Sequence, residues 1–163
     1  MENESERVNH PKYYEKKVDD ERDHPECIEL LEVITEGLPG VLALDIGQLK
    51  YLYRFGSKAE GGLSRREKAI EDVNKILWYA KNAAQKWGFY DINYARHSVV
   101  RRTIARLVAE EFAFDKPLIL KSYVRSVVYS AYDLSSGHDI CQYVDAVERL
   151  VKAIEETPEE VWN

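Results

Sequence analysis

The longest helical pattern in the chain is SRREKAIEDVNKILWYAKNAAQKWG, residues 64–88. It begins with Ser64 and Glu67 at the spacing of a capping box, in which each side chain binds the backbone N–H of the other residue. Apolar residues then recur every three or four positions, at Ile70, Val73, Leu77, Ala80, Ala84 and Trp87. Such a seam is typical of a helix that packs along its whole length against another helix, and Gly88 ends it.

A second helix is predicted over residues 40–55, with Gly56 as its C-terminal cap. One face of this helix carries Gly47, Lys50, Tyr51 and Arg54 at helical spacing. Glycine inside a helix costs about 1 kcal/mol relative to alanine. We therefore expect a partner helix or a ligand to approach closely at Gly47, and the phosphates of such a ligand would meet Lys50 and Arg54.

The remaining chain is also helical in pattern, without a repeat of fixed period. Further apolar stripes lie within residues 27–34, 95–114, 117–131 and 140–154. No stretch alternates for long enough to predict a strand. We predict an all-α fold, a small helical bundle of about six helices in two halves with no sheet. The expected organisation is a disordered tail at 1–7, a helical domain with an extended N-terminal segment at 8–89, and a second helical region at 90–163.

The chain is acidic, with 163 residues, a net charge of −6 and a pI of about 5.3. A duplex-binding surface needs clustered positive charge, so we expect no duplex nucleic acid partner. The N-terminus does not resemble a signal peptide, and no apolar run approaches the ~18 residues of a membrane span. Cys27 and Cys141 are predicted to be reduced core residues. These features predict a cytoplasmic protein with no membrane partner.

Association between copies of the chain is a further expectation. The sequence contains eleven Tyr and three Trp, and aromatic side chains serve interfaces as well as cores. Together with the long seam over residues 70–87, they predict a homo-oligomer.

Four short segments stand in order at compatible spacing. They are Asn9-His10-Pro11-x-Tyr13-Tyr14, Glu26-x-Ile28-Glu29, Gly47-x-x-x-Tyr51-x-x-Arg54 with Gly56-x-Lys58, and Glu71-Asp72-x-x-Lys75-x-x-Trp78-Tyr79. Together they resemble the small phage-encoded nucleotide kinase-like (SaV-like) family, of largely unknown function, over about residues 8–85. Two positions depart from the family pattern, because Tyr13 replaces a histidine and Gln48 replaces an asparagine.

The resemblance implies a nucleotide ligand and a site in the first half of the chain. Lys50, Arg54 and Lys58 would gather around phosphates, and Asp72 would orient Arg54 or hold a metal. The aromatic part of the predicted site consists of His10, Tyr13, Tyr14, Tyr51 and Tyr79. In the alternative interpretation, salt bridges among Lys50, Arg54, Glu71 and Asp72 pin one helix to the next. No residue is predicted to be catalytic, and no metal-ligand spacing typical of zinc is present.

Three functions remain open at this stage. The resemblance implies a kinase-like protein that binds a nucleoside phosphate, with Mg²⁺ and ATP as cofactors; however, the chain has no P-loop, so side chains would have to hold the phosphates. The second function is a non-catalytic sponge that sequesters a nucleotide signal of host anti-phage defence in the cytoplasm of an infected cell. The third is a Mg²⁺-dependent, all-helical nucleotide pyrophosphatase, in which Glu26, Glu29 and Glu32 would face Glu71 and Asp72.

Overall fold

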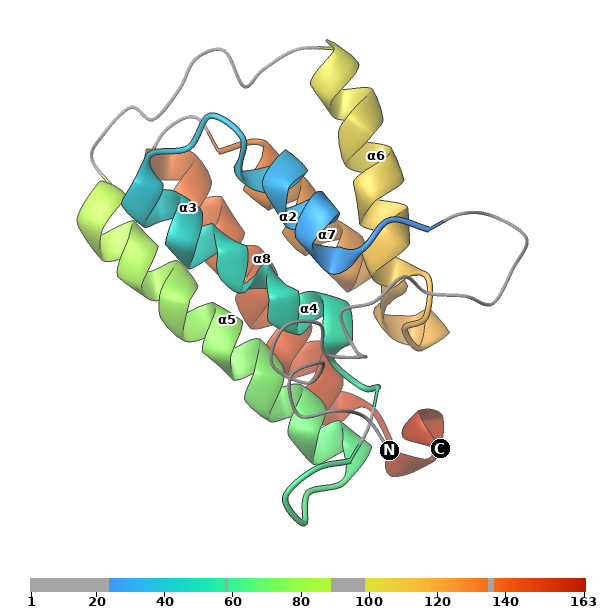
Figure 1. Ribbon diagram of the computed structural model, residues 1–163. Helices are drawn as coiled ribbons and strands as arrows, with labels where there is room; N and C mark the ends of the chain where they lie inside the picture. Colours follow the sequence, from blue (N-terminus) through green and yellow to red (C-terminus); the bar gives the residue numbers. More distant parts are fainter. Residues whose placement is uncertain (1–23, 58, 89–98, 135–136) are drawn as a thin grey trace, which may run out of the picture.

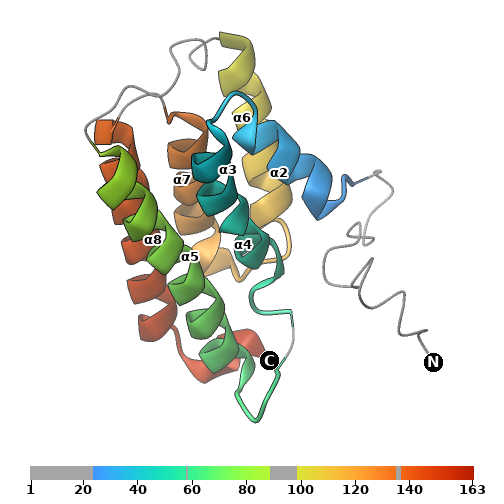
Figure 2. The same cartoon turned by 60° about the vertical axis from the view of Figure 1, so that its left-hand side comes forward.

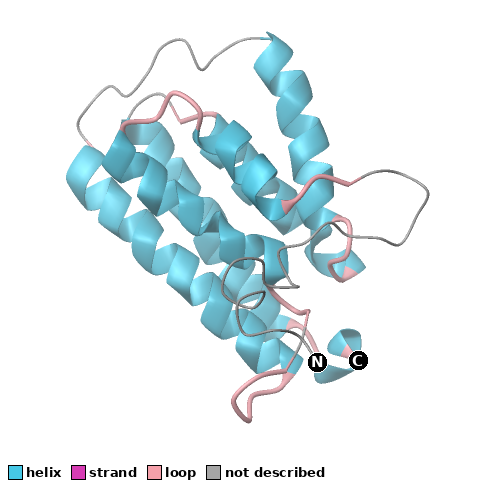
Figure 3. Ribbon diagram, viewed as in Figure 1, coloured by secondary structure: helices cyan, strands magenta, loops and turns pink. Residues whose placement is uncertain are grey.

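The computed structural model describes residues 24–57, 59–88, 99–134 and 137–163, and helices dominate them (Figure 1). These ranges contain no strand or sheet; their one β contact is an isolated bridge between Glu60 and Leu63 (Figure 3). The predicted all-α bundle is confirmed. Within the same ranges, no helix is both long and apolar enough to cross a membrane. The tail predicted at 1–7 lies outside the described residues.

The pattern at residues 64–88 forms α5, Arg65–Trp87. The predicted capping box is present, since Glu67 N donates to Ser64 Oγ at 3.2 Å and Ser64 N donates to Glu67 Oε2 at 2.8 Å. The buried apolar seam consists of Ala69, Val73, Ile76, Ala80 and Ala83, so it is rotated slightly from the predicted one, and Ile70, Leu77, Ala84 and Trp87 are only partly buried. Helix α8, Gly137–Glu156, lies along this seam (Figures 1 and 2).

The helix predicted over residues 40–55 is divided into three parts. They are α3 (Gly40–Ile46), the 3₁₀ turn η2 (Gly47–Leu49) and α4 (Lys50–Arg54). The prediction of one continuous helix is therefore wrong. The break begins at Gly47, which fits the low helix propensity of glycine. Gly56 follows α4 with a φ of 78°, a left-handed conformation that glycine adopts without strain.

The other helices complete the bundle. They are α2 (Cys27–Thr35), α6 (Val99–Ala113), the 3₁₀ turn η4 (Leu118–Leu120), α7 (Lys121–Tyr132) and, after α8, the 3₁₀ turn η5 (Glu159–Trp162). Helix α6 packs on α7, α7 packs on α8, and α2 contacts both α4 and α7 (Figure 2). Leu42 and Leu52 share one apolar core with Val127 and Ile154. The two halves of the sequence therefore contribute to a single core.

The two cysteines differ in environment, and neither forms a disulfide. Cys27 is buried at the start of α2, as predicted, whereas Cys141 is exposed on α8. The prediction that both are core residues is wrong for Cys141. The core-facing stripe of α8 runs through Ile140, Tyr143 and Val147, and Cys141 falls beside it.

A buried lysine joins the end of α4 to the second half of the chain. Lys116 is only 4% exposed, and its Nζ donates to the carbonyl oxygens of Tyr53 at 2.7 Å and Phe55 at 3.0 Å. Carbonyls at a helix C-terminus have no partner within the helix, so they need an external donor. The ammonium also lies 4.4 Å from the centroid of the Phe55 ring and 3.5 Å from Asp115 Oδ1. Lys116 therefore caps α4 and holds it against the segment that precedes η4.

Replacing Lys116 with methionine should lower the free energy of unfolding by roughly 2–3 kcal/mol, because two buried carbonyl oxygens lose their donor while the apolar stem is kept. Urea unfolding followed by circular dichroism measures the change. Lys152→Met, at an exposed position of α8, is the matched control and should stay within about 0.5 kcal/mol of the wild type. Equal stabilities of the two variants would contradict the capping role.

Candidate functional site

Three cations surround the ring of Tyr51, which is partly buried on α4. The distances to the ring centroid are 5.2 Å from Lys50 Nζ, 4.8 Å from Arg54 Cζ and 5.1 Å from Lys75 Nζ. All three lie within the ~6 Å over which a cation is attracted to an aromatic face. Lys50 and Arg54 belong to α4 itself, whereas Lys75 comes from α5. The ring of Tyr51 therefore collects positive charge from two helices.

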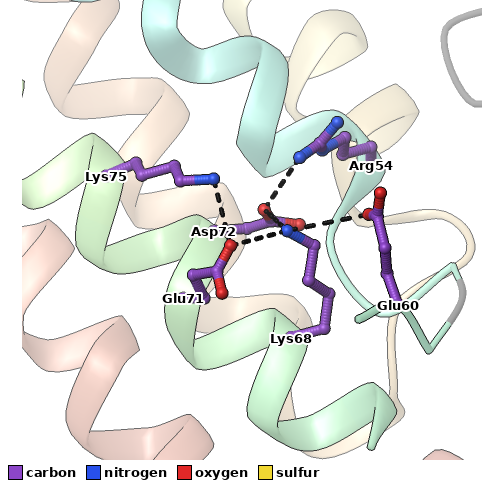
Figure 4. Close-up of polar contacts among 6 residues, drawn as sticks. All are labelled: Arg54, Glu60, Lys68, Glu71, Asp72 and Lys75. Atoms are coloured by element: carbon purple, nitrogen blue, oxygen red, sulfur yellow. Dashed lines mark hydrogen bonds and ion pairs between the residues drawn. The ribbon is translucent and has the colours of Figure 1, made fainter. Parts of the chain in front are cut away.

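The buried carboxylate of Asp72 on α5 binds Arg54 at the end of α4 and so joins the two helices (Figure 4). Asp72 Oδ1 lies 3.0 Å from Arg54 Nη2 and 3.3 Å from Lys68 Nζ. The side chain of Asp72 is only 3% exposed. A carboxylate buried so deeply is strongly destabilising unless cations and hydrogen bonds compensate for the lost water. Arg54 and Lys68 supply that compensation, so Asp72 orients Arg54, one of the two roles predicted for it.

Lys68 also binds Glu71 and Glu60, two carboxylates that are more exposed than Asp72 (Figure 4). Its Nζ lies 2.8 Å from Glu71 Oε1 and 3.7 Å from Glu60 Oε2, and Glu71 also binds Lys75 at 3.1 Å. Burial alone would lower the pKa of Lys68, but the bonds to Glu71 and Asp72 outweigh it and raise the pKa above its usual value. The hydrogen bonds from Lys68 and then Lys75 lower the pKa of Glu71. Lys68 and Glu71 therefore both stay charged at neutral pH.

Only some of the salt bridges expected in the alternative interpretation are present. Arg54 and Asp72 do pair across the two helices, but Glu71 pairs with lysines of its own helix. Among the carboxylates that the structure describes, none forms an ion pair with Lys50. The charge of Lys50 is therefore left for other partners.

The contacts between these elements define an antiparallel alignment. Asn82 Nδ2 lies 3.3 Å from both carboxylate oxygens of Asp45, Lys75 faces Tyr51, and Asp72 faces Arg54. Tyr79 lies on the same stripe of α5, between Lys75 and Asn82, because these positions follow one another at helical spacing. The alignment therefore places Tyr79 across from Gly47 and Gln48. The Tyr79 ring meets the exposed Trp78 ring edge-on at 4.9 Å.

The structure brings some of the predicted site residues together. Lys50, Tyr51, Arg54 and Asp72 are in contact or in adjacent positions, and Tyr79 lies further along the same stripe of α5. The other predicted site residues, His10, Tyr13, Tyr14 and Lys58, lie outside the described residues. Sequence reasoning missed Lys68 and assigned no contact to Lys75. The available signal for Lys68 was its spacing of three and four residues from Glu71 and Asp72.

Two of the three glutamates predicted to share Mg²⁺ with Glu71 and Asp72 have other contacts. Glu26 and Glu29 form the capping box at the start of α2, in which Glu26 N donates to Glu29 Oε2 at 2.6 Å. Glu71 and Asp72 bind cations instead. In the ranges that the structure describes, no three His, Cys, Asp or Glu side chains are arranged to hold a metal ion.

Comparison with known proteins gives no relative for this arrangement. No protein-family model matches the chain, and neither a curated protein nor a solved structure matches it. The resemblance to the phage family therefore stays a prediction.

Replacing Asp72 with asparagine should lower the free energy of unfolding by roughly 3 kcal/mol, because Arg54 and Lys68 would face a neutral group in a buried position. Chemical denaturation measures the loss. Glu60→Gln is the matched control, since Glu60 also contacts Lys68 but has a side chain that is 47% exposed. It should change stability by less than about 1 kcal/mol. If both variants unfold at the same denaturant concentration, Asp72 does not hold α4 on α5.

Proposed function

We propose that the protein binds a nucleoside phosphate at the Tyr51 face, which consists of Gly47, Lys50, Tyr51, Arg54 and Lys75. The observation that carries the proposal is the convergence of three cations on one partly exposed aromatic ring. The whole chain has a net charge of −6, so this local positive charge stands out against an acidic background. A positive site of this kind attracts small anions even on an acidic protein.

Different residues of the Tyr51 face would bind different parts of the nucleotide. Lys50 and Lys75 offer ammonium groups to phosphate oxygens, and an aromatic ring such as Tyr51 can stack on a base. Asp72 already holds Arg54 in place at 3.0 Å. A ligand would therefore lose less side-chain entropy in recruiting Arg54 than in recruiting a mobile arginine.

Lys50 contributes most to the preference for an anion. Its nearest described aromatic partner is the Tyr51 ring at 5.2 Å, and none of the described carboxylates pairs with it. A phosphate group can therefore approach Lys50 without breaking an ion pair. By contrast, Lys75 is shared with Glu71, so part of its charge is already offset.

The contacts support binding more directly than turnover. The resemblance implies kinase-like activity, which would need ATP and Mg²⁺. Asp72, the carboxylate predicted as a possible metal ligand, is paired with Arg54 and Lys68. That pairing favours a structural role for Asp72, as expected of a non-catalytic nucleotide sponge. The experiment must therefore measure the affinity for nucleotides and their chemical conversion separately.

Lys50→Ala should weaken binding of nucleoside phosphates by roughly tenfold, because one unit charge near a phosphate contributes about 1–2 kcal/mol. Isothermal titration with mono-, di- and triphosphates measures the affinities, and higher salt should weaken all of them. The variant should unfold like the wild type. Lys86→Ala, at an exposed position of the same α5 that carries Lys75, is the matched control and should keep the affinity.

Conversion is tested by incubating the wild type with nucleoside monophosphates, ATP and Mg²⁺, then separating the nucleotides after heat denaturation. Diphosphates would identify a kinase, ligand recovered intact would support a sponge, and pyrophosphate released from triphosphates would identify a pyrophosphatase. The binding proposal fails if the wild type binds no nucleotide, or if Lys50→Ala binds as tightly as the wild type.

A further inference from the structure

Within the described residues, neither close packing nor backbone strain requires a glycine at position 47. A Cβ atom built on it would meet no heavy atom of a neighbouring segment within 4 Å. Its φ of −60° and ψ of −15° are values that any residue adopts. Glycine also weakens a helix relative to alanine. The described part of α5 therefore lies across from Gly47 without approaching the position of its missing side chain closely, and the close approach of a helix or a ligand expected from the sequence is not made by a described helix.

Tyrosines occupy the position one turn after Gly47 and the position across from it on α5. Tyr51 follows Gly47 by one helical turn on the same face, and the alignment of α5 places Tyr79 across from it. The neighbouring Gln48 turns its amide nitrogen to Leu44 O at 3.2 Å. The backbone of Gly47 thus lies between the position of Tyr51 on α4 and the position of Tyr79 on α5, where the Tyr79 ring meets the Trp78 ring edge-on.

We infer that the base of the bound nucleotide lies directly on the backbone of Gly47, between Tyr51 and Tyr79, and that its phosphate extends along α4 to Lys50 and Arg54. This inference rests on the proposed function and adds the position and orientation of the ligand. A glycine lets a flat ring approach the backbone more closely than any side chain would allow. Gly47 and Arg54 are seven residues apart, about 12 Å along the axis when the larger rise of the 3₁₀ turn is included, a length comparable to that of an extended nucleoside monophosphate.

In this arrangement the missing side chain at Gly47 determines specificity. A methyl group at this position would occupy the space of the base, while Lys50 and Arg54 would still attract the phosphate. Loss of affinity should therefore be large for nucleotides and small for inorganic phosphate. A second copy of the chain packed on Gly47 would give the opposite result, because the methyl group would disturb assembly rather than nucleotide affinity.

The test compares Gly47→Ala with Gly40→Ala. Gly40 opens α3, and a Cβ built on it also meets no neighbouring heavy atom within 4 Å, so it is a matched control. Both variants should unfold at the same temperature as the wild type or slightly higher, since alanine restricts the unfolded chain. Only Gly47→Ala should weaken the binding of nucleoside monophosphates, by roughly tenfold or more. Isothermal titration, thermal unfolding and light scattering give the three readouts.

Each possible result of this test either supports or overturns the inference. Nucleotide binding by the wild type together with equal affinity of Gly47→Ala overturns the inference and leaves the proposed function standing. No nucleotide binding by the wild type overturns both. A lower unfolding temperature for Gly47→Ala, or a smaller assembly with unchanged nucleotide affinity, shows that Gly47 serves packing and also overturns the inference. Weaker nucleotide binding at unchanged stability and unchanged mass supports it.

Discussion

The carboxylate of Asp72 fixes how α4 lies on α5. It is almost completely buried, and it lies 3.0 Å from Arg54 and 3.3 Å from Lys68. Because a buried carboxylate needs compensating charge, the fold is stable only when the end of α4 points its guanidinium at this position of α5. That requirement sets Tyr51 against Lys75 and extends to the contact between Asp45 and Asn82. Gly47 and Lys50 are therefore placed by the interaction of Arg54, which lies about one turn beyond Lys50 on the same face.

Much of the fold could be predicted because its signals are local. Helix α5 begins at the capping box of Ser64 and Glu67 and ends next to Gly88, where the sequence pattern ends. The break at Gly47 could not be predicted in the same way. An apolar stripe through Leu42, Ile46 and Leu49 is satisfied both by an α-helix and by a helix with a short 3₁₀ turn, so the pattern does not distinguish them.

The site was less predictable than the fold because its charges depend on tertiary contacts. Lys68 appears in the sequence as one of many lysines, and its burial arises only when Glu60 and the end of α4 fold over it. Lys116 precedes Pro117 in the sequence with no local residue that indicates its partners, yet it binds carbonyls more than sixty residues away. Spacing along one helix carries no information on such partners. The pair of Arg54 and Asp72 was predictable because the salt-bridge interpretation, and one of the two roles expected of Asp72 in the ligand site, required the two residues to be close.

The two interpretations of the Tyr51 face turn out to apply to different residues. Arg54, Lys68 and Lys75 are balanced by Glu60, Glu71 and Asp72, all of which lie toward the C-terminal end of α4. Lys50, at the other end of the same short helix, pairs with none of these carboxylates. A cluster in which every cation was paired would have to give up an ion pair for each bond to an anion, with little net gain. Because the carboxylates gather at one end, the positive charge that a ligand can use is concentrated at Lys50, next to the bare backbone of Gly47.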